Sequence, residues 1–253
     1  MLVDRLVASV LKRAEGLGLE VTDYCAALRY CYAIVSDGSR EAMGLAYLPR
    51  LDIGHDTLPE AVELGDALEL VSSTSLLHKA LGISMANAAS QFLLEPERLL
   101  KGDIVDHLDL RPNDKVVLVG YIKPIYDALS KTGLRAVVIE RDPILRSDLA
   151  LPDTMLPRVL EDATACIATG SCLVNDTLDL VVREARKCRI RALVGPTAQL
   201  LPDLLHSAGF THVASIHVSD VRSAARAVLR GGGTRELLKY SVKYVSLSEN
   251  FIS

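Results

Sequence analysis

Small and polar residues follow four apolar runs in the second half of the chain, each at the point where the run ends. They are Gly120, Tyr121, Ile122, Lys123 and Pro124 after the first run, Glu140, Arg141, Asp142 and Pro143 after the second, Thr169, Gly170, Ser171, Asn175 and Thr177 after the third, and Gly195, Pro196 and Thr197 after the fourth. Such residues offer carboxylates, hydroxyls and backbone amides to a ligand. Because the carboxyl ends of parallel strands meet at one edge of a sheet, the four groups are expected to line one cleft.

Glu140 is a candidate for direct ligand contact in that cleft. It follows Gly120 by 20 residues, the spacing at which an acidic residue binds a ribose hydroxyl in nucleotide-binding domains. The loop GYIKP lacks the GxGxxG pattern, which argues against a nicotinamide dinucleotide. Asp142 would add a second acceptor or a metal ligand. The alternative is that Glu140 only forms a solvated ion pair with Arg141 or Lys123.

The stretch TGSCLVNDTLDL (residues 169–180) has two compatible interpretations. In one, Asn175 or Asp176 is the N-cap of the following helix, since both residue types are preferred there. In the other, the hydroxyls and free amides of this loop hold an anionic group. Ser171 and Cys172 are also candidate nucleophiles. No histidine lies nearby in the sequence, however, and a buried, unreactive cysteine is far commoner than a reactive one.

Histidine and cysteine spacing indicates no closed metal site. The six histidines form no HxH or HExxH motif and the five cysteines form no CxxC motif, so a structural zinc site is not expected. His55, in the loop LDIGHDTLPE, and His78, on the next helix, are candidates to reach a cleft, although surface histidines are commoner. A site built from scattered Asp, Glu and His residues stays open. Asn87, in the run ANAAS, either makes a buried hydrogen bond to a loop or faces the cleft.

The elements that must position these groups fall into two halves with different patterns. Residues 1–106 begin with an amphipathic helix and then show strand-like and helical runs, which predicts a small α+β domain. Residues 107–253 alternate strands with helices, which predicts a Rossmann-like α/β domain with a parallel sheet. Strands are expected at 27–35, 41–48, 116–120, 134–140, 163–169, 190–195, 211–218 and 243–248, and helices at 61–71, 75–94, 125–131, 156–162, 177–187, 200–208 and 221–229.

The bulk composition excludes several classes of partner. The chain has 253 residues, of which 49% are hydrophobic, and a net charge of −4, so no basic face for nucleic acid or an anionic membrane is expected. Charged residues interrupt the first apolar helix, which argues against a signal peptide or a membrane span. The odd number of cysteines favours free thiols in a reduced, cytoplasmic protein. The first helix and residues 75–94 offer apolar faces for a homo-oligomer.

Taken together, ALGISMANAAS, KVVLVGYIKP, VVIERDP, IATGSCLVNDTLD and LVGPTAQLLPDLL resemble a prokaryotic family described as a "putative heavy-metal chelation" domain. The resemblance covers nearly the whole chain, in the right order. It implies an enolase N-terminal-like domain before a Rossmann-like domain, with a site between them. At that site it places Asn87, Gly120, Pro124, Glu140, Gly170, Ser171, Asn175, Thr177, Gly195 and Pro196.

Three functions compete on this evidence. The first is binding or turnover of a metal chelator or another small anionic molecule, with a transition metal or a metal chelate as the implied cofactor. The second is an enzyme that uses a nucleoside cofactor, such as a methyltransferase, with Glu140 on the ribose. The third is a scaffold whose cleft is a subunit contact. Polar groups at four successive strand ends exceed what a packing surface needs, which favours the first two.

Overall fold

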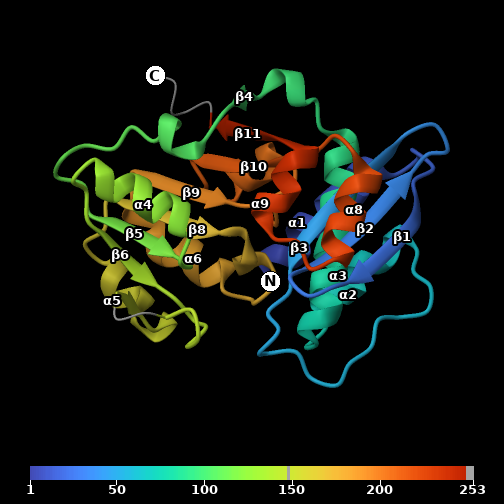
Figure 1. Cartoon of the computed structure of the whole chain (residues 1–253), viewed down its shortest axis with the longest axis horizontal. Coiled ribbons are helices and arrows are strands. Elements are labelled where there is room, and N and C mark those ends of the chain that lie inside the picture. Colours follow the sequence, from blue (N-terminus) through green and yellow to red (C-terminus); the bar gives the residue numbers. More distant parts are fainter. Residues whose placement is uncertain (147–148, 249–253) are drawn as a thin grey trace.

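The computed structural model describes residues 1–146 and 149–248, which form two sheets with helices on their faces (Figure 1). The helices are α1 (Leu2–Ala14), α2 (Ala67–Ser72), α3 (Leu76–Leu93), α4 (Lys123–Lys131), α5 (Leu156–Leu160), α6 (Leu178–Glu184), α7 (Pro202–Ser207), α8 (Val221–Leu229) and α9 (Thr234–Leu237). The strands are β1 (Glu20–Ala26), β2 (Tyr30–Ser36), β3 (Glu41–Tyr47), β4 (Leu100–Lys101), β5 (Val116–Val119), β6 (Ala136–Ile139), β7 (Ala150–Leu151), β8 (Ala165–Thr169), β9 (Ile190–Val194), β10 (His212–Val218) and β11 (Ser241–Leu247).

The larger sheet confirms the predicted α/β fold. Its order is β4-β11-β10-β9-β8-β5-β6-β7, and the strands from β10 to β7 are parallel, whereas β11 runs antiparallel to β10 and β4. Numbered along the chain, β5 to β10 follow the 3-2-1-4-5-6 order of doubly wound nucleotide-binding folds. The order reverses between β5 and β8. The carboxyl ends of these two strands therefore flank the crevice in which such folds bind ligands.

The central strand β5 is apolar because both of its faces are buried. All four residues of β5 are buried, and alternate ones enter different cores: Val117 and Val119 pack in one, and Val116 and Leu118 in the other. In a strand that is buried on both faces no side chain reaches solvent, so its sequence is a continuous apolar run.

The smaller sheet, β1-β2-β3, is antiparallel. Sequence analysis missed β1, because its sequence EVTDYCA is only partly buried and contains no apolar run. The strand expected from residue 27 begins at Tyr30 instead, since the N–H of Ala27 donates to the carbonyl of Tyr30 and closes a turn. The helix expected at 61–71 is α-helical only from Ala67.

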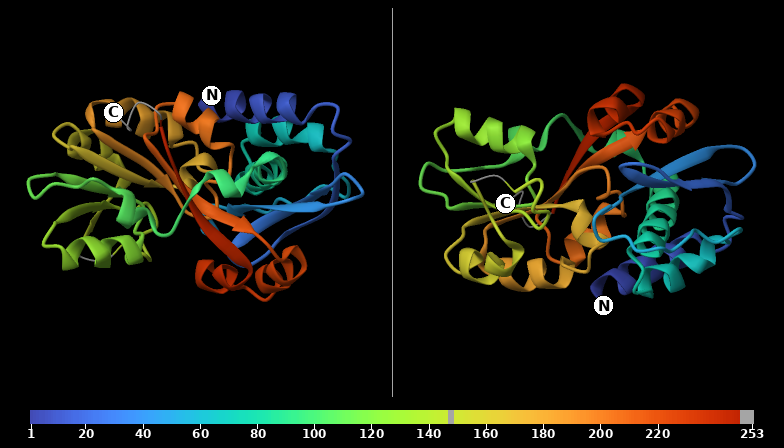
Figure 2. Two further views of the ribbon diagram at one scale, coloured as in Figure 1. Left: turned by 90° about the horizontal axis from the view of Figure 1, so that it is seen from above. Right: turned by 60° about the horizontal axis from the view of Figure 1, so that its bottom comes forward.

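Elements from both halves of the chain cover the smaller sheet. Side chains alternate along β2, so that Cys31 and Ala33 face the core that contains α3, while Tyr32 and Ile34 pack with Val228 of α8. Helix α8 comes from the second half of the chain, and it lies across the blue strands in Figures 1 and 2. The two halves are therefore interlocked. The boundary after residue 106 and the likeness to an enolase N-terminal domain stay predictions.

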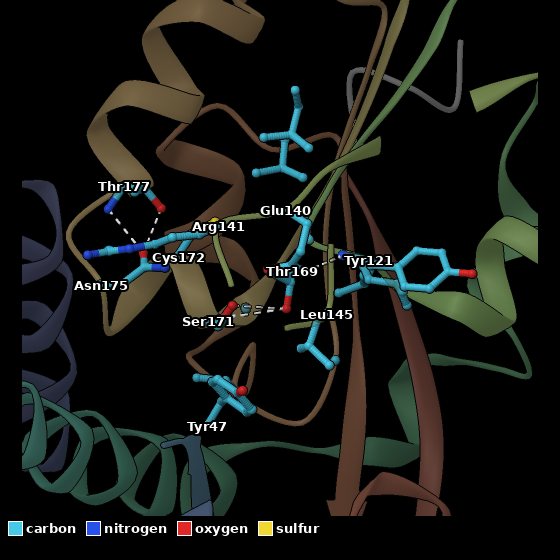
Figure 3. A pocket seen from close by; sticks show the side chains of 18 of the residues that line it. Tyr47, Tyr121, Glu140, Arg141, Leu145, Thr169, Ser171, Cys172, Asn175 and Thr177 are labelled. Carbon is cyan, nitrogen blue, oxygen red and sulfur yellow. Dashed lines mark hydrogen bonds between the residues drawn. The ribbon is translucent and has the colours of Figure 1, made fainter. Parts of the chain in front are cut away.

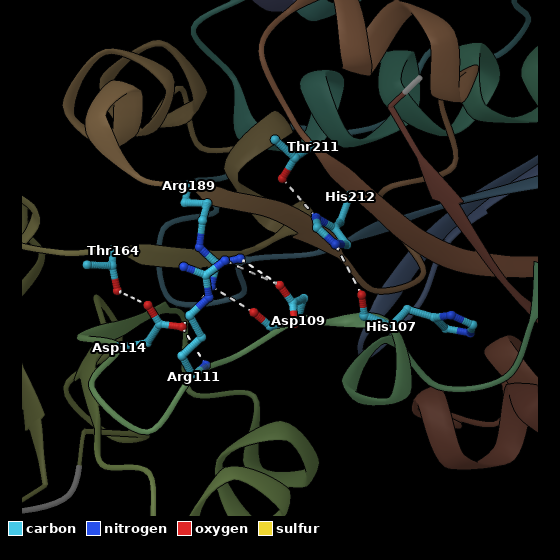
Figure 4. Close-up of polar contacts among 8 residues, drawn as sticks. All are labelled: His107, Asp109, Arg111, Asp114, Thr164, Arg189, Thr211 and His212. Carbon is cyan, nitrogen blue, oxygen red and sulfur yellow. Dashed lines mark hydrogen bonds and ion pairs between the residues drawn. The ribbon is translucent and has the colours of Figure 1, made fainter. Parts of the chain in front are cut away.

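A polar network joins the amino ends of β8, β9 and β10, whereas the crevice lies at the carboxyl ends of the strands (Figure 4). Arg189 pairs with Asp109 at 3.3 Å and with Asp114 at 2.9 Å, and the hydroxyl of Thr164 donates to Asp114 at 2.7 Å. His212 lies fully buried beside them, with its ring nitrogens 2.8 Å from the hydroxyl of Thr211 and 3.2 Å from the carbonyl of His107. Burial lowers the pKa of His212 to about 4.

No helix in the described part of the chain is both long enough and apolar enough to cross a membrane. All five cysteines fall in that part and are free thiols.

Candidate functional site

A cavity of about 630 Å³ opens at the carboxyl ends of β5, β6, β8 and β9 (Figure 3). Its walls combine apolar side chains with small polar groups, and both halves of the chain contribute to it. Of the twelve residues predicted to bind a ligand, ten line it: Gly120, Pro124, Glu140, Thr169, Gly170, Ser171, Asn175, Thr177, Gly195 and Pro196. Five further residues expected at the strand ends also line it: Tyr121, Ile122, Lys123, Arg141 and Thr197. Asn87 and Asp142 do not line it. The ligand-binding roles of all twelve residues stay predictions.

Gly120 brings the ends of β5 and β8 together at the point where the strand order reverses. Its φ angle is +93°, in the region that favours glycine, and a Cβ placed on it would lie 2.6 Å from Cγ2 of Thr169. Position 120 of the GYIKP loop therefore requires glycine for steric reasons. The chain turns sharply here and enters α4 at Lys123.

The Glu140 carboxylate is held by two backbone amides. The N–H of Tyr121 donates to Oε2 at 2.8 Å, and the N–H of Asp142 donates to Oε1 at 2.9 Å. The two cations proposed as partners point elsewhere: Lys123 pairs with Asp127, and Arg141 lies 3.6 Å from Asp52. Among the described residues, none forms an ion pair with Glu140, so the alternative of a simple solvated pair with Arg141 or Lys123 is not observed.

The loop after β8 is organised by its own side chains. Oγ1 of Thr169 accepts from the N–H and the hydroxyl of Ser171, and Oδ1 of Asn175 accepts from the N–H and the hydroxyl of Thr177 (Figure 3). Helix α6 starts at Leu178 with Thr177 as its N-cap, so neither Asn175 nor Asp176 caps it as expected. Asn175 instead bonds two residues ahead, which is a turn that competes with helix formation.

Asp176 links this loop to the first half of the chain. Its φ of +59° is uncommon for a residue other than glycine, and its carboxylate pairs with the amine of Lys79 on α3. Lys79 is buried, so this ion pair fixes the backbone between the cavity residues Asn175 and Thr177.

Cys172 is unsuited to act as a nucleophile. The residue is 1% exposed, and burial raises the pKa of its thiol to about 11. Because the thiolate is the reactive form, the thiol is inert at neutral pH. This supports the interpretation of Cys172 as a small apolar residue.

Asn87 joins the two halves rather than facing the cavity. Its side-chain amide donates to the carbonyl of Leu45 at 2.7 Å and to the carbonyl of Thr197 at 2.9 Å. The small residues around it allow close packing, since a Cβ on Gly44 would lie 2.0 Å from the carbonyl oxygen of Ser84. Of the two interpretations of ANAAS, the buried hydrogen bond to a loop is the one observed.

The free edge of β3 is closed by side chains of the loop after β9. The N–H of Leu45 donates to Oε1 of Gln199 at 2.7 Å, and the N–H of Tyr47 donates to the hydroxyl of Thr197 at 2.9 Å. Both side chains are buried. These bonds hold Tyr47 against the cavity, which it enters from the strand at the bottom of Figure 3.

The residues of this cavity do not fit a bare metal ion. Within the described ranges, no three His, Cys, Asp or Glu side chains lie close enough together to hold one. His55 and His78 do not line the cavity, and a ring nitrogen of His78 lies 2.9 Å from the carbonyl of Thr57. Oδ1 of Asp142 accepts from the N–H of Ile144 at 2.8 Å. Cys172, the cysteine in the cavity, is a protonated thiol.

Sequence analysis missed several residues that line the cavity. They are Tyr30, Tyr47, Leu145, Asp153, Thr154, Leu156, Leu180 and Thr234, besides the strand residues Val119, Ile139 and Val194 that directly precede predicted residues. Tyr30 and Tyr47 meet edge to face at 6.4 Å, and the hydroxyl of Tyr30 lies 2.8 Å from that of Thr234. Burial, together with the carboxylates of Asp142 and Glu140, raises the pKa of Tyr47, which keeps its hydroxyl protonated. Only tertiary structure brings these residues to the cavity.

Two family models match the chain, and both carry the description "Putative heavy-metal chelation". One matches residues 103–247 and the other residues 9–90. An uncharacterized protein of Methanocaldococcus jannaschii is 33% identical over 218 residues, a match that covers 81% of each chain.

Two crystal structures share the fold. A DUF364 protein of unknown function from Pyrococcus horikoshii has a TM-score of 0.90 at 26% identity, over 98% of this chain and 100% of that one. A DUF364 protein from Desulfitobacterium hafniense, also of unknown function, has a TM-score of 0.76 at 17% identity, over 96% and 98% of the two chains. The family resemblance seen in the sequence is confirmed: the chain belongs to the DUF364 family, described as "Putative heavy-metal chelation".

Proposed function

We propose that the chain binds a small organic molecule in this cavity, and that it handles a metal-chelating compound rather than a bare ion. The observation that carries the proposal is the cavity itself. Its volume of about 630 Å³ lies within the range of small-molecule sites, and apolar walls with a few polar groups are typical of them. The cavity also lies at the switch point of the strand order, where doubly wound folds bind ligands.

The donor set argues for an organic ligand over an ion. Soft heavy metals prefer thiolate and imidazole ligands. The thiol of Cys172 keeps its proton, and no histidine is among the described residues that line the cavity. Each oxygen of Glu140 already accepts one backbone hydrogen bond. A chelating molecule would instead supply its own metal donors, and the protein would have to recognise only the organic part.

The ligand's anionic group, if it carries one, would lie away from Glu140, because two negative charges close together repel each other. The side of the cavity with Arg141 and the side-chain amide of Asn175 offers hydrogen-bond donors. In the view of Figure 3, the Arg141 side chain lies between Glu140 and Asn175. We expect a carboxylate or phosphate of the ligand on this side.

A nucleoside-dependent enzyme is the second candidate, and the position of Glu140 favours it. Glu140 directly follows β6, the second strand in the 3-2-1-4-5-6 order, where an acidic residue binds ribose in related folds. Gly120 provides the turn after the first strand of that order. A nucleoside needs less backbone contact than a dinucleotide, so the missing glycines are a smaller obstacle.

Binding titrations test the proposal. We expect calorimetry with Ni²⁺, Zn²⁺ and Cu²⁺ to detect no stoichiometric tight site in the wild-type protein. Titration with organic chelators and with nucleosides is expected to detect one, and Glu140→Gln is expected to weaken it. The matched control is Glu69→Gln, which changes an exposed carboxylate on α2. Tight binding of a bare ion that Glu140→Gln abolishes would contradict the proposal.

A further inference from the structure

We propose that the Glu140 carboxylate recognises a vicinal diol, meaning two hydroxyl groups on neighbouring carbon atoms of the ligand. This inference rests on the proposed function, because it names the group by which the organic ligand of that cavity is held.

The hydrogen bonds that Glu140 already accepts determine how many more its carboxylate can accept from a ligand. An ionised carboxylate has about four acceptor positions, two on each oxygen. One position on Oε2 is taken by the N–H of Tyr121, and one on Oε1 by the N–H of Asp142. One position is therefore left on each oxygen. Two parallel donors with the spacing of the carboxylate oxygens complete this set, and adjacent hydroxyl groups provide them.

The nearby cations leave the Glu140 carboxylate free to accept further hydrogen bonds. The amine of Lys123 contacts both carboxylate oxygens of Asp127, and Arg141 is turned to Asp52. Since no described residue forms an ion pair with Glu140, its carboxylate repels anionic groups and groups that offer only lone pairs, and it favours groups that donate a hydrogen bond, such as O–H. A diol that is bound to a metal has lost its hydroxyl protons. The site is thus expected to take the metal-free form of a chelating diol.

The surroundings of Glu140 fit a ring that bears the diol. Ile139 and Leu156 are buried apolar residues that line the cavity, and Leu145 lines it from a half-exposed position. Tyr47 contributes an aromatic ring from the first half of the chain. Two sources share this chemistry: an aromatic diol of the catechol type, which is itself a chelating group, and the cis-diol of a ribose.

Paired probes test the inference in the wild-type protein. Calorimetry would compare adenosine with 2′-deoxyadenosine, and 4-methylcatechol with 2-methoxy-4-methylphenol, each second compound lacking one hydroxyl donor. We expect the diol of at least one pair to bind about tenfold or more tightly than its partner, since a hydrogen bond to a charged group has this value. The pair that shows the difference identifies the source.

Variants then assign the difference to Glu140. In Glu140→Gln the preference for the diol over its partner is expected to disappear, whereas in Glu69→Gln it is expected to remain. The probe comparison in the wild-type protein needs no variant, so it decides the question even if Glu140→Gln folds poorly. Equal binding within both pairs, or no binding of any probe, overturns the inference. Native mass spectrometry separates this result from a failure of the proposed function, because an organic adduct without any preference for the diol would overturn the diol inference and leave the proposed function standing.

Discussion

The backbone N–H of Tyr121 donates to the Glu140 carboxylate across 2.8 Å, so the loop after β5 and the end of β6 share one hydrogen bond at the rim of the cavity. The aromatic ring of Tyr121 points away from this bond in Figure 3. The contact therefore depends on the backbone of residue 121 and on the glycine turn before it. A turn that failed to form would leave Glu140 without this support.

Gly120→Ala tests the turn. The new side chain would face a φ of +93° and a contact of 2.6 Å with Thr169, so we expect a loss of about 2–4 kcal/mol in the free energy of unfolding. Denaturant titration measures it. The double variant with Thr169→Ser should recover part of the loss, because it removes the clashing methyl group. Gly65→Ala, at a glycine with no atom within 4 Å of the new Cβ, is the control. An unchanged midpoint for Gly120→Ala would contradict this account of the turn.

Asn87→Ala tests the link between the two halves. The substitution leaves the carbonyls of Leu45 and Thr197 without their side-chain donor in a buried place, and we expect a loss of about 2–3 kcal/mol. Thermal and denaturant unfolding measure the change. Asn113→Ala, at an exposed asparagine before β5, should cost less than about 1 kcal/mol. Equal costs for the two variants would show that the amide of Asn87 does not hold the halves together.

Cys172 is expected to resist alkylation in the folded protein. With a pKa of about 11 and almost no exposure, it should react with N-ethylmaleimide at pH 7.5 only after unfolding. Cys25, which is partly exposed, should be labelled first. Peptide mapping after timed labelling measures both rates. Labelling of Cys172 as fast as Cys25 would reopen the interpretation of Cys172 as a nucleophile.

His212 is expected to make stability fall in mild acid. Burial lowers its pKa from an ordinary value of 6.5 to about 4, so below pH 6.5 the unfolded chain binds a proton that the folded chain does not. The stabilisation is complete above pH 6.5 and is lost as the pH falls to about 4, for a total on the order of 3 kcal/mol. Denaturant titrations between pH 7 and 4.5 measure the slope. His212→Gln should flatten it; an identical slope in that variant would assign the effect to other groups.

The large sheet could be predicted from the sequence more completely than the small one. Strands β5 and β8 are largely apolar because they are buried on both faces, and that pattern is visible without a structure. Strand β1 is half exposed and carries no such pattern. The strand ends predicted Glu140, Thr169 and Gly195 at one cavity, because parallel strands place their carboxyl ends together.

The remaining wall of the cavity was not predictable from local sequence. Tyr47 reaches the cavity because the hydroxyl of Thr197 and the side chain of Gln199 bind the edge of β3, and these residues lie about 150 positions away along the chain. Asn87 was singled out as unusual, which was justified, but its neighbours in sequence could not show which way its amide faced. The direction depends on the carbonyls of Leu45 and Thr197.

Mass spectrometry of the freshly purified protein tests the central claim most directly. Native and denaturing spectra, with elemental analysis of the same sample, would show what the cavity carries. We predict an organic adduct that is released on denaturation, that is reduced in Glu140→Gln and that is retained in Glu69→Gln. A stoichiometric heavy metal with no organic adduct, lost in Glu140→Gln, would contradict the claim that the chain binds an organic molecule rather than a bare ion.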